Sequence, residues 1–354
     1  MKLSRFSQLN KWLCHYFDVD SITFYPLTGD AGFRKYYRFE LQNTAYIAVD
    51  AIPEMSNNLA FVEIQKTFQK SDINVPDIIV SDLAQGFLCL SDFGDELFSD
   101  NLTLNNMEQA YKKAIKLLPT IANVSLPENY TLPLYSADFI RVELNIFTQW
   151  LLGEHLSLSL SEQEQCSLDN CFNILIQSAI EQPQVVVHRD YHSRNLMLLP
   201  DEENSIGVID FQDAVIGPIT YDIVSLLRDC YVKWPTENVE ALFQYYCQLV
   251  DLENKCSEVK PEQYVRWFDL MGLQRHIKAS GIFARLFHRD NKEGYLKDIP
   301  LTLSYIVDIS AKYPELKALH DLVLNKVVPA LQNKEKSKEE SKAESKVNLN
   351  GAGS

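Results

Sequence analysis

Residues 185–195 read VVVHRDYHSRN, an apolar strand followed by the pattern H-R-D-x-x-x-x-N. This pattern is typical of the catalytic loop of phosphoryl-transfer enzymes. In such a loop Asp190 accepts the proton of the hydroxyl group that receives the phosphoryl group, and His188 belongs to the same catalytic motif. Asn195 follows five residues after Asp190 and can offer an amide oxygen to Mg²⁺.

A second metal-binding position follows in the chain. Residues 206–210 read IGVID, a strand that ends in Asp210, and a polar turn at residues 201–204 precedes it. Asn195 and Asp210 are two hard oxygen ligands, and Mg²⁺ completes such a site with nucleotide phosphates and water. The alternative to a metal site is that Asp190, Asn195 and Asp210 are ordinary loop and turn residues and that His188 has only a capping role. The three features together, at these spacings, favour the metal site.

The elements around this loop predict an α+β, protein-kinase-like, two-lobed fold. A small β-rich lobe comes first, with short runs of aromatic and branched residues. Its predicted strands are 22–27, 33–41, 45–51, 77–81 and 86–90, with a helix at 58–70. A larger helical lobe with a catalytic hairpin follows. Its predicted helices are 107–122, 137–155, 162–181, 221–232, 237–252, 261–287 and 315–331, and its predicted β segment is 185–187, 197–199 and 207–210.

Three segments follow from this order. We predict a nucleotide-binding lobe at residues 1–95 and a helical lobe with the catalytic loop and the acceptor site at residues 96–332. Residues 334–346 read KEKSKEESKAESK and hold no large apolar residue. Such a segment buries too little surface to offset its ordering entropy, so we predict a disordered tail at residues 333–354.

Composition excludes several classes of protein. The chain has 354 residues with a formal net charge of −15, which argues against binding to nucleic acid or to an anionic membrane surface. Its seven cysteines are scattered and form no C-x-x-C pair, so reduced thiols in a cytoplasmic protein are expected. No run approaches 18 apolar residues and no leader pattern is evident. Nothing in the sequence indicates an obligate protein partner.

The sequence of the first lobe indicates which residues hold the nucleotide. Gly29 and Gly32 allow a turn to approach phosphates. The third strand reads YIAVD at residues 46–50 and lacks the phosphate-pairing lysine of protein kinases, so another cation is needed. Arg34, Lys35 and Arg38 are the candidates, and Arg34 and Arg38, which share one strand face, are favoured. The alternative is a solvated basic strand face. Backbone groups near Leu90–Asp92 should face the adenine. The D-F-G string at residues 92–94 is not the metal motif that it is in protein kinases.

The chain resembles the aminoglycoside phosphotransferase and choline-kinase superfamily. Residues 208–229 (VIDFQDAVIGPITYDIVSLLRD), 29–38 (GDAGFRKYYR), 49–54 (VDAIPE) and 267–278 (WFDLMGLQRHIK) narrow the resemblance to its bacterial anomeric kinases of N-acetylmuramate and N-acetylglucosamine. The resemblance implies ATP-dependent phosphorylation of the C1 hydroxyl with Mg²⁺, in cytoplasmic peptidoglycan recycling. It also implies that Asp222 braces the catalytic loop, beside the simpler role of a helix N-cap.

The helical lobe should select the acceptor. Residues 261–290 carry five basic residues against three acidic ones, and Arg275, Lys278, Arg285 and Arg289 recur on or near one helix face. Arg275 and Lys278 are predicted to bind an anionic acceptor such as the lactyl carboxylate of N-acetylmuramate, and Glu143 to bind sugar hydroxyls. The alternative is a helix face that pairs with the acidic surface of the protein.

Two other functions stay open at this point. One is a kinase of the same superfamily that acts on an aminoglycoside, choline or a homoserine-like alcohol. The other is an inactive pseudokinase that serves as a binding module. The missing strand lysine is the feature that favours a pseudokinase, whereas Asp190, Asn195 and Asp210 argue against it.

Overall fold

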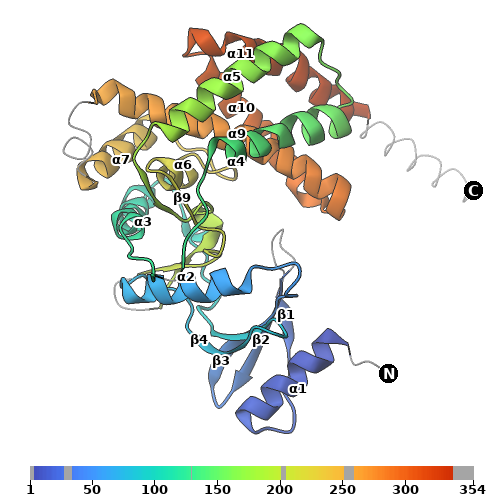
Figure 1. Cartoon of the computed structure of the whole chain (residues 1–354), viewed down its shortest axis with the longest axis vertical. Coiled ribbons are helices and arrows are strands. Elements are labelled where there is room, and N and C mark those ends of the chain that lie inside the picture. Colours follow the sequence, from blue (N-terminus) through green and yellow to red (C-terminus); the bar gives the residue numbers. More distant parts are fainter. Residues whose placement is uncertain (1–3, 28–33, 129, 201–204, 251–258, 338–354) are drawn as a thin grey trace, which may run out of the picture. The chain divides into compact units, whose positions relative to one another are not determined.

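A computed structural model describes residues 4–27, 34–128, 130–200, 205–250 and 259–337 (Figure 1). The chain divides into two compact units, each built from several segments. The first unit is Met1–Leu134, Gln184–Leu227 and Trp234–Ser257, and the second is Tyr135–Pro183, Arg228–Lys233 and Glu258–Ser354. The catalytic loop therefore shares a unit with the N-terminal sheet. The predicted lobes at residues 1–95 and 96–332 are a different division of the chain, and they stay a prediction.

The N-terminal sheet has five antiparallel strands in the order β1-β2-β3-β5-β4. They are β1 (Tyr25–Leu27), β2 (Lys35–Leu41), β3 (Thr44–Asp50), β4 (Ile78–Asp82) and β5 (Phe87–Ser91). Gln42 and Asn43 join β2 to β3 with φ angles of 52° and 62°. Two consecutive positive φ angles suit the twist of a two-residue hairpin, which fixes the register of these strands.

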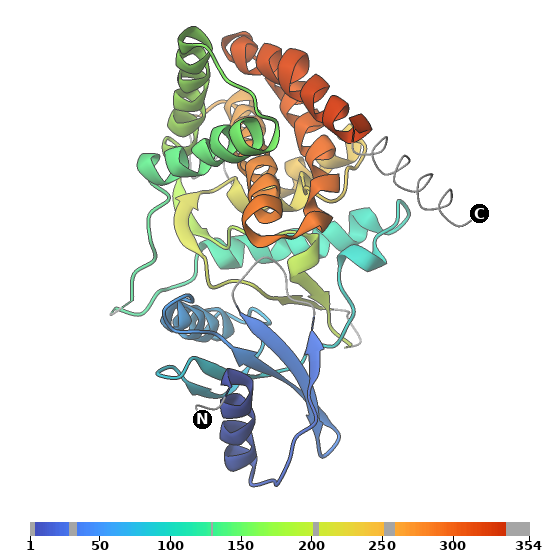
Figure 2. The ribbon, with the colours of Figure 1, turned by 90° about the vertical axis from the view of Figure 1, so that its right-hand side faces the viewer.

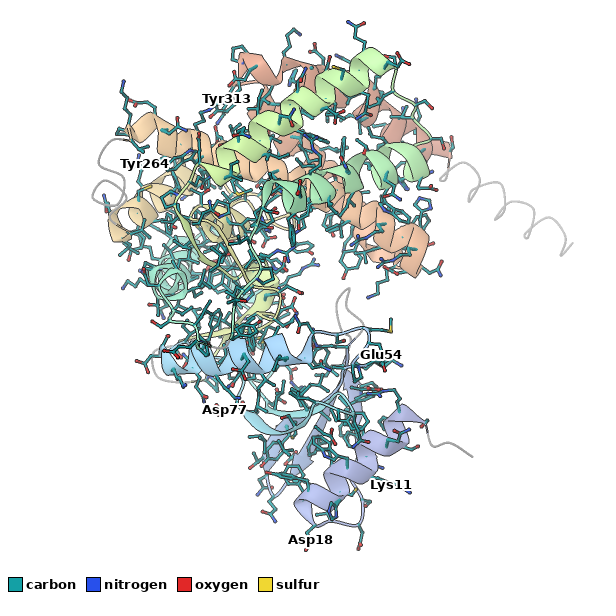
Figure 3. All side chains as sticks on the ribbon, in the orientation of Figure 1. Lys11, Asp18, Glu54, Asp77, Tyr264 and Tyr313 are labelled. Carbon is teal, nitrogen blue, oxygen red and sulfur yellow. The ribbon has the colours of Figure 1, made fainter. Side chains whose placement is uncertain are left out.

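Helix α1 (Arg5–Phe17) covers one face of the sheet and was not predicted as a helix. Leu9 and Leu13 are fully buried there against Phe39, Ala48 and Phe87. Figure 3 labels Lys11 and Asp18 on and just after this helix, and both are exposed. Leu9, Leu13 and Phe17 recur every four residues after the N-cap Ser4, so the sequence does carry a helical period, and burial of this stripe stabilises the helix.

Helix α2 (Asn58–Lys70) connects the sheet to the catalytic strands of the same unit. Its first turn is capped by Asn57, whose side chain accepts a hydrogen bond from the Ala60 amide. Phe61 and Phe68 pack against Phe211 with ring centroids 4.9 and 5.9 Å apart. Because Phe211 follows Asp210 directly, α2 fixes the position of the predicted metal strand.

The catalytic loop lies between two small antiparallel sheets rather than in a single hairpin. β6 (Gln184–Val187) pairs with β9 (Val215–Pro218), and β7 (Leu196–Leu198) pairs with β8 (Ile206–Val208). The other helices of this unit are α3 (Met107–Ala122), α6 (Tyr221–Leu227) and α7 (Thr236–Leu249), with one-turn helices η1 (Ser99–Asn101) and η3 (Ser193–Asn195). The predicted helix at 221–232 thus ends five residues early.

The second unit is helical, and α9 runs through it (Figure 2). Its helices are α4 (Ala137–Ile146), the π-helix η2 (Phe147–His155), α5 (Glu162–Ile180), α9 (Pro261–Asp290), η4 (Glu293–Asp298), α10 (Ile299–Ser310), η5 (Pro314–Leu316), α11 (Lys317–Leu322) and the π-helix η6 (Val323–Val327). Helix α10 was not predicted. A small β-rich part and a larger helical part confirm the predicted fold class.

Helical backbone continues through residues 328–337. Of the tail predicted to be disordered, residues 333–337 are therefore helical, and residues 338–354 lie outside the described residues. Lys334 donates a hydrogen bond to the His155 carbonyl at the end of η2. Within the part of the chain that the structure describes, no helix is long and apolar enough to span a bilayer.

Gly281 allows α9 to approach the junction of α4 and η2. A Cβ atom at this position would lie 2.6 Å from the Ile146 carbonyl carbon and the Phe147 nitrogen. These are backbone atoms and cannot rotate away. Gly281→Ala should therefore lower the free energy of unfolding by about 1–3 kcal/mol, although alanine is the better helix former.

Urea denaturation of the purified variant checks this prediction. Gly294→Ala is the matched control, because a Cβ atom there meets nothing within 4 Å. A Gly281→Ala midpoint equal to that of the wild type would show that the two backbones are not in contact.

Candidate active site

Asp222 holds the catalytic loop in a strained backbone conformation. Arg189 has a φ angle of 75°, in the left-handed region that large side chains avoid. One Asp222 carboxylate oxygen accepts the Arg189 amide at 3.0 Å, and the other accepts the His188 amide at 2.7 Å. Asp222 lies in the first turn of α6 and is 4 % exposed. Two charge-assisted bonds of this kind offset the cost of the strain.

His188 joins the catalytic loop to the strand that carries Asp210. Its Nε2 atom lies 3.1 Å from the Ile209 carbonyl oxygen, so Nε2–H is the donor of this bond. The side chain is fully buried, and burial lowers its pKa to about 4. His188 is therefore neutral at pH 7, and its contacts are those of a positioning residue rather than a proton acceptor.

Asp190, Asn195 and Asp210 come together as the sequence predicts. The Asn195 side-chain amide donates to the Asp190 carbonyl at 3.0 Å and lies 3.4 Å from an Asp210 carboxylate oxygen. Gln212 donates to the other Asp210 oxygen at 2.8 Å. Burial and the charge of Asp190 raise the pKa of Asp210. Asp210 itself has a φ angle of 64°, a second strained position in the site.

This arrangement fits a nucleotide-bound magnesium ion. A divalent cation would offset the burial and the neighbouring charge that raise the pKa of Asp210. Among the described residues, no group of three or more His, Cys, Asp or Glu side chains could hold a metal. Mg²⁺ needs only one or two protein oxygens when phosphates and water supply the rest. Asn195 and Asp210 are thus a suitable pair, whereas a protein-only metal cage is not present in this part of the chain.

Arg34 and Arg38, the two predicted phosphate-binding cations, have different surroundings. Arg38 bonds Asp92 and Asp95, with its Nε atom 2.5 Å from an Asp92 oxygen, and its guanidinium also donates to the Gly94 carbonyl. It therefore clamps the segment after β5. Arg34 makes one 3.3 Å bond to the Asn57 carbonyl and lies over the Phe61 ring.

Gly29 and Gly32, predicted to approach the phosphates, lie outside the described residues. The third strand, which lacks the phosphate-pairing lysine, ends in Asp50. Asp50 is 4 % exposed and forms an ion pair with Arg5 of α1. Arg5 Nε and an Asp50 oxygen are 2.7 Å apart. This strand end is thus committed to holding α1.

Tyr36 of β2 is a further residue near the candidate site, and sequence reasoning did not single it out. It is half-buried, and burial together with the charge of Asp210 raises its pKa to about 12. Arg34 and Asp213 also act on this pKa, so the hydroxyl lies within electrostatic range of both the predicted cation and the predicted metal ligand. An aromatic residue in a strand predicts sheet packing, and no signal in the sequence separates Tyr36 from its neighbours.

Of the backbone at Leu90–Asp92 that is predicted to face adenine, the structure leaves only part unpaired. Leu90 pairs with Ile47 of β3 on one side and with Ile78 of β4 on the other. The chain leaves the sheet only after Ser91, so the backbone from Asp92 onward is the part that is available to contact the adenine. The Phe93 ring packs on Gly207 of β8, where a Cβ atom would lie 2.8 Å from the ring. Beside this segment is a cavity of about 470 Å³, lined by Ala45, Asp92, Phe93, Gly94, Leu199 and Pro200.

Two of the predicted acceptor residues, Glu143 and Lys278, bind each other in the second unit. Lys278 Nζ lies 2.8 Å from one Glu143 oxygen, and the other oxygen accepts from Gln274 at 3.1 Å and from Tyr135. The side chains of Glu143 and Lys278 are 6 % and 12 % exposed. These contacts indicate a structural ion pair and do not support a direct contact of Glu143 with sugar hydroxyls. Arg275 is half-buried on the same helix.

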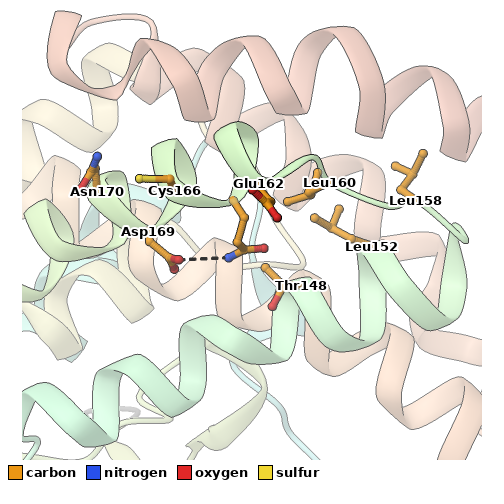
Figure 4. Close-up of a pocket in the computed structure, with 9 residues that line it drawn as sticks. Thr148, Leu152, Leu158, Leu160, Glu162, Cys166, Asp169 and Asn170 are labelled. Atoms are coloured by element: carbon orange, nitrogen blue, oxygen red, sulfur yellow. Dashed lines mark hydrogen bonds between the residues drawn. The ribbon is translucent and has the colours of Figure 1, made fainter.

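The second unit contains another cavity, and none of the predicted site residues lines it. It lies between η2 and α5 and has a volume of about 600 Å³ (Figure 4). Leu152, Leu158 and Leu160 line it, and its charged lining residues are Glu162 and Asp169. Gln165 donates to Asp169 at 3.3 Å, as the dashed line in Figure 4 shows. An acidic lining without a cation does not suit an anionic acceptor.

Two curated relatives are similar to this chain over most of its length. The first, an N-acetylmuramate/N-acetylglucosamine kinase of Pseudomonas aeruginosa, is 36% identical over 330 residues, which are 90% of this chain and 96% of that protein. The second, an N-acetylmuramate/N-acetylglucosamine kinase of Pseudomonas putida, is 38% identical over 296 residues, which are 84% of this chain and 86% of that protein.

Solved structures share the fold at much lower identity. An ethanolamine kinase of Plasmodium vivax has a TM-score of 0.64 and 15% identity, over 89% of both chains. An ADP-bound aminoglycoside phosphotransferase has a TM-score of 0.58 and 14% identity, over 86% of this chain and 98% of that chain. A family model described as the phosphotransferase enzyme family matches residues 23–257. The chain therefore belongs to the phosphotransferase enzyme family.

Proposed function

We propose that this phosphotransferase uses ATP to phosphorylate the anomeric C1 hydroxyl of N-acetylmuramate and N-acetylglucosamine. The observation that carries the proposal is the similarity, over 90% and 84% of the chain, to two relatives that are named kinases of these sugars. The sequence motifs independently resemble anomeric kinases. The reaction would serve peptidoglycan recycling in the cytoplasm, with the sugar and ATP as small-molecule partners and no nucleic acid, membrane or obligate protein partner.

Asp190 is the proposed general base. Its place beside Asn195 and Asp210 supports this role, since the acceptor hydroxyl must lie near both the base and the phosphates. The base acts only when the loop backbone is held, so Asp222 and His188 are proposed as positioning residues. His188 stays neutral and keeps its hydrogen bond to Ile209 across the working pH range.

Asn195 and Asp210 would hold Mg²⁺ through their side-chain oxygens. When bound, the ion neutralises charge on the transferred phosphoryl group. Arg34 is the favoured cation for the triphosphate, because Arg38 already contacts Asp92 and Asp95. Tyr36 adds a hydroxyl within electrostatic range of Asp210. Residues from Asp92 onward, beside the 470 Å³ cavity, are the proposed adenine contact.

Another acceptor alcohol is the second candidate. The structures at 15% and 14% identity are an ethanolamine kinase and an aminoglycoside phosphotransferase, and they share the same fold. The two amino-sugar kinases are much more similar to this chain, at 36% and 38% identity, and therefore favour an amino sugar as the acceptor. A pseudokinase is less favoured, because Asp222 accepts the His188 amide and Asn195 lies 3.4 Å from Asp210, contacts that support the proposed roles of these residues.

A panel of acceptors tests the proposed function. ATP consumption should be fast with N-acetylmuramate and N-acetylglucosamine, and slow with kanamycin, choline and homoserine. Phosphorus NMR of the product should show an anomeric phosphate, split by the C1 proton. Turnover with choline or an aminoglycoside alone, or a product phosphorylated on the primary hydroxyl, would contradict the proposal.

Asp190→Ala should lower kcat by at least 100-fold, because a positioned base contributes about 10²–10⁴-fold and the acceptor also loses its orientation. ATP binding should change little, since Asp190 is assigned to the acceptor. Steady-state assays and fluorescent-nucleotide titration measure the two quantities. The exposed carboxylate Asp100 is the control. A variant that keeps more than about a tenth of the wild-type kcat would exclude Asp190 as the base.

Asp210→Asn and Asn195→Ala should each raise the Mg²⁺ concentration needed for half-maximal activity. The first change removes a charge and the second removes an oxygen ligand. Magnesium titrations at saturating ATP measure the shift, with Asp100→Ala again expected to match the wild type. Unchanged magnesium dependence in both site variants would overturn the metal assignment.

A further inference from the structure

We infer that Arg285 of α9, rather than Arg275 or Lys278, recognises an anionic group on the acceptor. The inference rests on the proposed function, whose larger sugar differs from the smaller one by a lactyl carboxylate. The sequence predicts the basic residues of α9 as one stripe, whereas among the described residues of the structure some of them form ion pairs and Arg285 does not.

Most basic residues of α9 already have partners. Lys278 is paired with Glu143 at 2.8 Å, Arg266 with Glu315 at 2.7 Å and Arg289 with Asp290 at 2.8 Å. Arg275 also has interactions within the described residues. The charges of Lys278, Arg266 and Arg289 are therefore compensated, and a ligand anion would have to compete with the carboxylates that hold them.

Arg285 differs from them. Its side chain is half-buried, and its Nε atom is buried without a hydrogen-bond partner in the part of the chain that the structure describes. No carboxylate of the described residues forms an ion pair with it. Burial and the neighbouring charge of Arg289 lower its pKa, while Asp290 and Glu143 act in the opposite direction. Those two carboxylates are already bonded to Arg289 and Lys278.

A guanidinium that is partly removed from water and unpaired is unfavourable unless a ligand supplies the missing acceptor. Its planar fork matches a carboxylate, which can accept two parallel N–H bonds. Arg285 lies seven residues, two helical turns, beyond Lys278 and so on the same face of α9 as the Lys278–Glu143 pair. The Lys278–Glu143 pair lies on this face of the helix, and Arg285 adds to the face a cation that has no ion-pair partner among the described residues.

The experiment compares both sugars on four variants. Arg285→Gln should lower kcat/KM for N-acetylmuramate by about 10- to 150-fold, the range for a charge-assisted hydrogen bond, and leave N-acetylglucosamine within about threefold. Arg285→Lys should recover part of the loss, since it keeps the charge without the fork. Lys278→Gln should weaken both sugars alike, because it leaves the buried Glu143 carboxylate without its ion-pair partner. Arg289→Gln, whose residue is exposed and paired with Asp290, should change neither.

Equal losses on both sugars in Arg285→Gln, or no loss on either, would overturn the inference, and so would a selective loss in Lys278→Gln. Melting temperatures of all variants show whether a loss reflects unfolding. If the wild type turns over neither sugar, the proposed function fails, and calorimetric titration with N-acetylmuramate then decides on Arg285. Binding to the wild type that is weakened at least tenfold in Arg285→Gln supports the assignment. Binding that is absent, or equal in both proteins, contradicts it.

Discussion

Two backbone amides bonded to one buried carboxylate determine the geometry of the catalytic loop. Asp222 accepts the His188 and Arg189 amides, and Arg189 would not otherwise keep a φ angle of 75°. Because α6 supplies Asp222 and β6 leads into His188, the loop is fixed from two elements that are distant in sequence. The proposed base Asp190 follows directly, so its direction depends on this contact.

The same constraint reaches the metal side of the site. His188 bonds the Ile209 carbonyl, and the next residue is Asp210, itself strained at a φ angle of 64°. Phe211 then packs against Phe61 of α2, which ties this strand to the N-terminal sheet. The proposed base, metal ligands and nucleotide-binding cation thus belong to one compact unit.

The sequence can propose this centre because its chemistry requires fixed spacings, and the roles of its residues stay predictions. Asp190, Asn195 and Asp210 are separated by few residues, and short strands leave little freedom between them. Predictions that depend on distant partners fare less well. Nothing in the sequence shows that Lys278 pairs with Glu143, 135 residues earlier, and a basic stripe on a helix looks the same whether its charges are compensated or free. Helices α1 and α10 were missed although both carry buried residues at helical spacings, Leu9 and Leu13 in α1 and Ile299, Leu303 and Ile306 in α10.

Asp222→Asn tests the central claim most directly. The change keeps the shape of the side chain, but the amide group offers one acceptor where two backbone amides need one each. We predict that kcat for N-acetylmuramate falls at least 100-fold, while nucleotide affinity stays within about threefold, since positioning of a general base contributes about 10²–10⁴-fold. Pre-steady-state phosphoryl transfer with a folded variant is the measurement. A transfer rate within tenfold of the wild type would contradict the account.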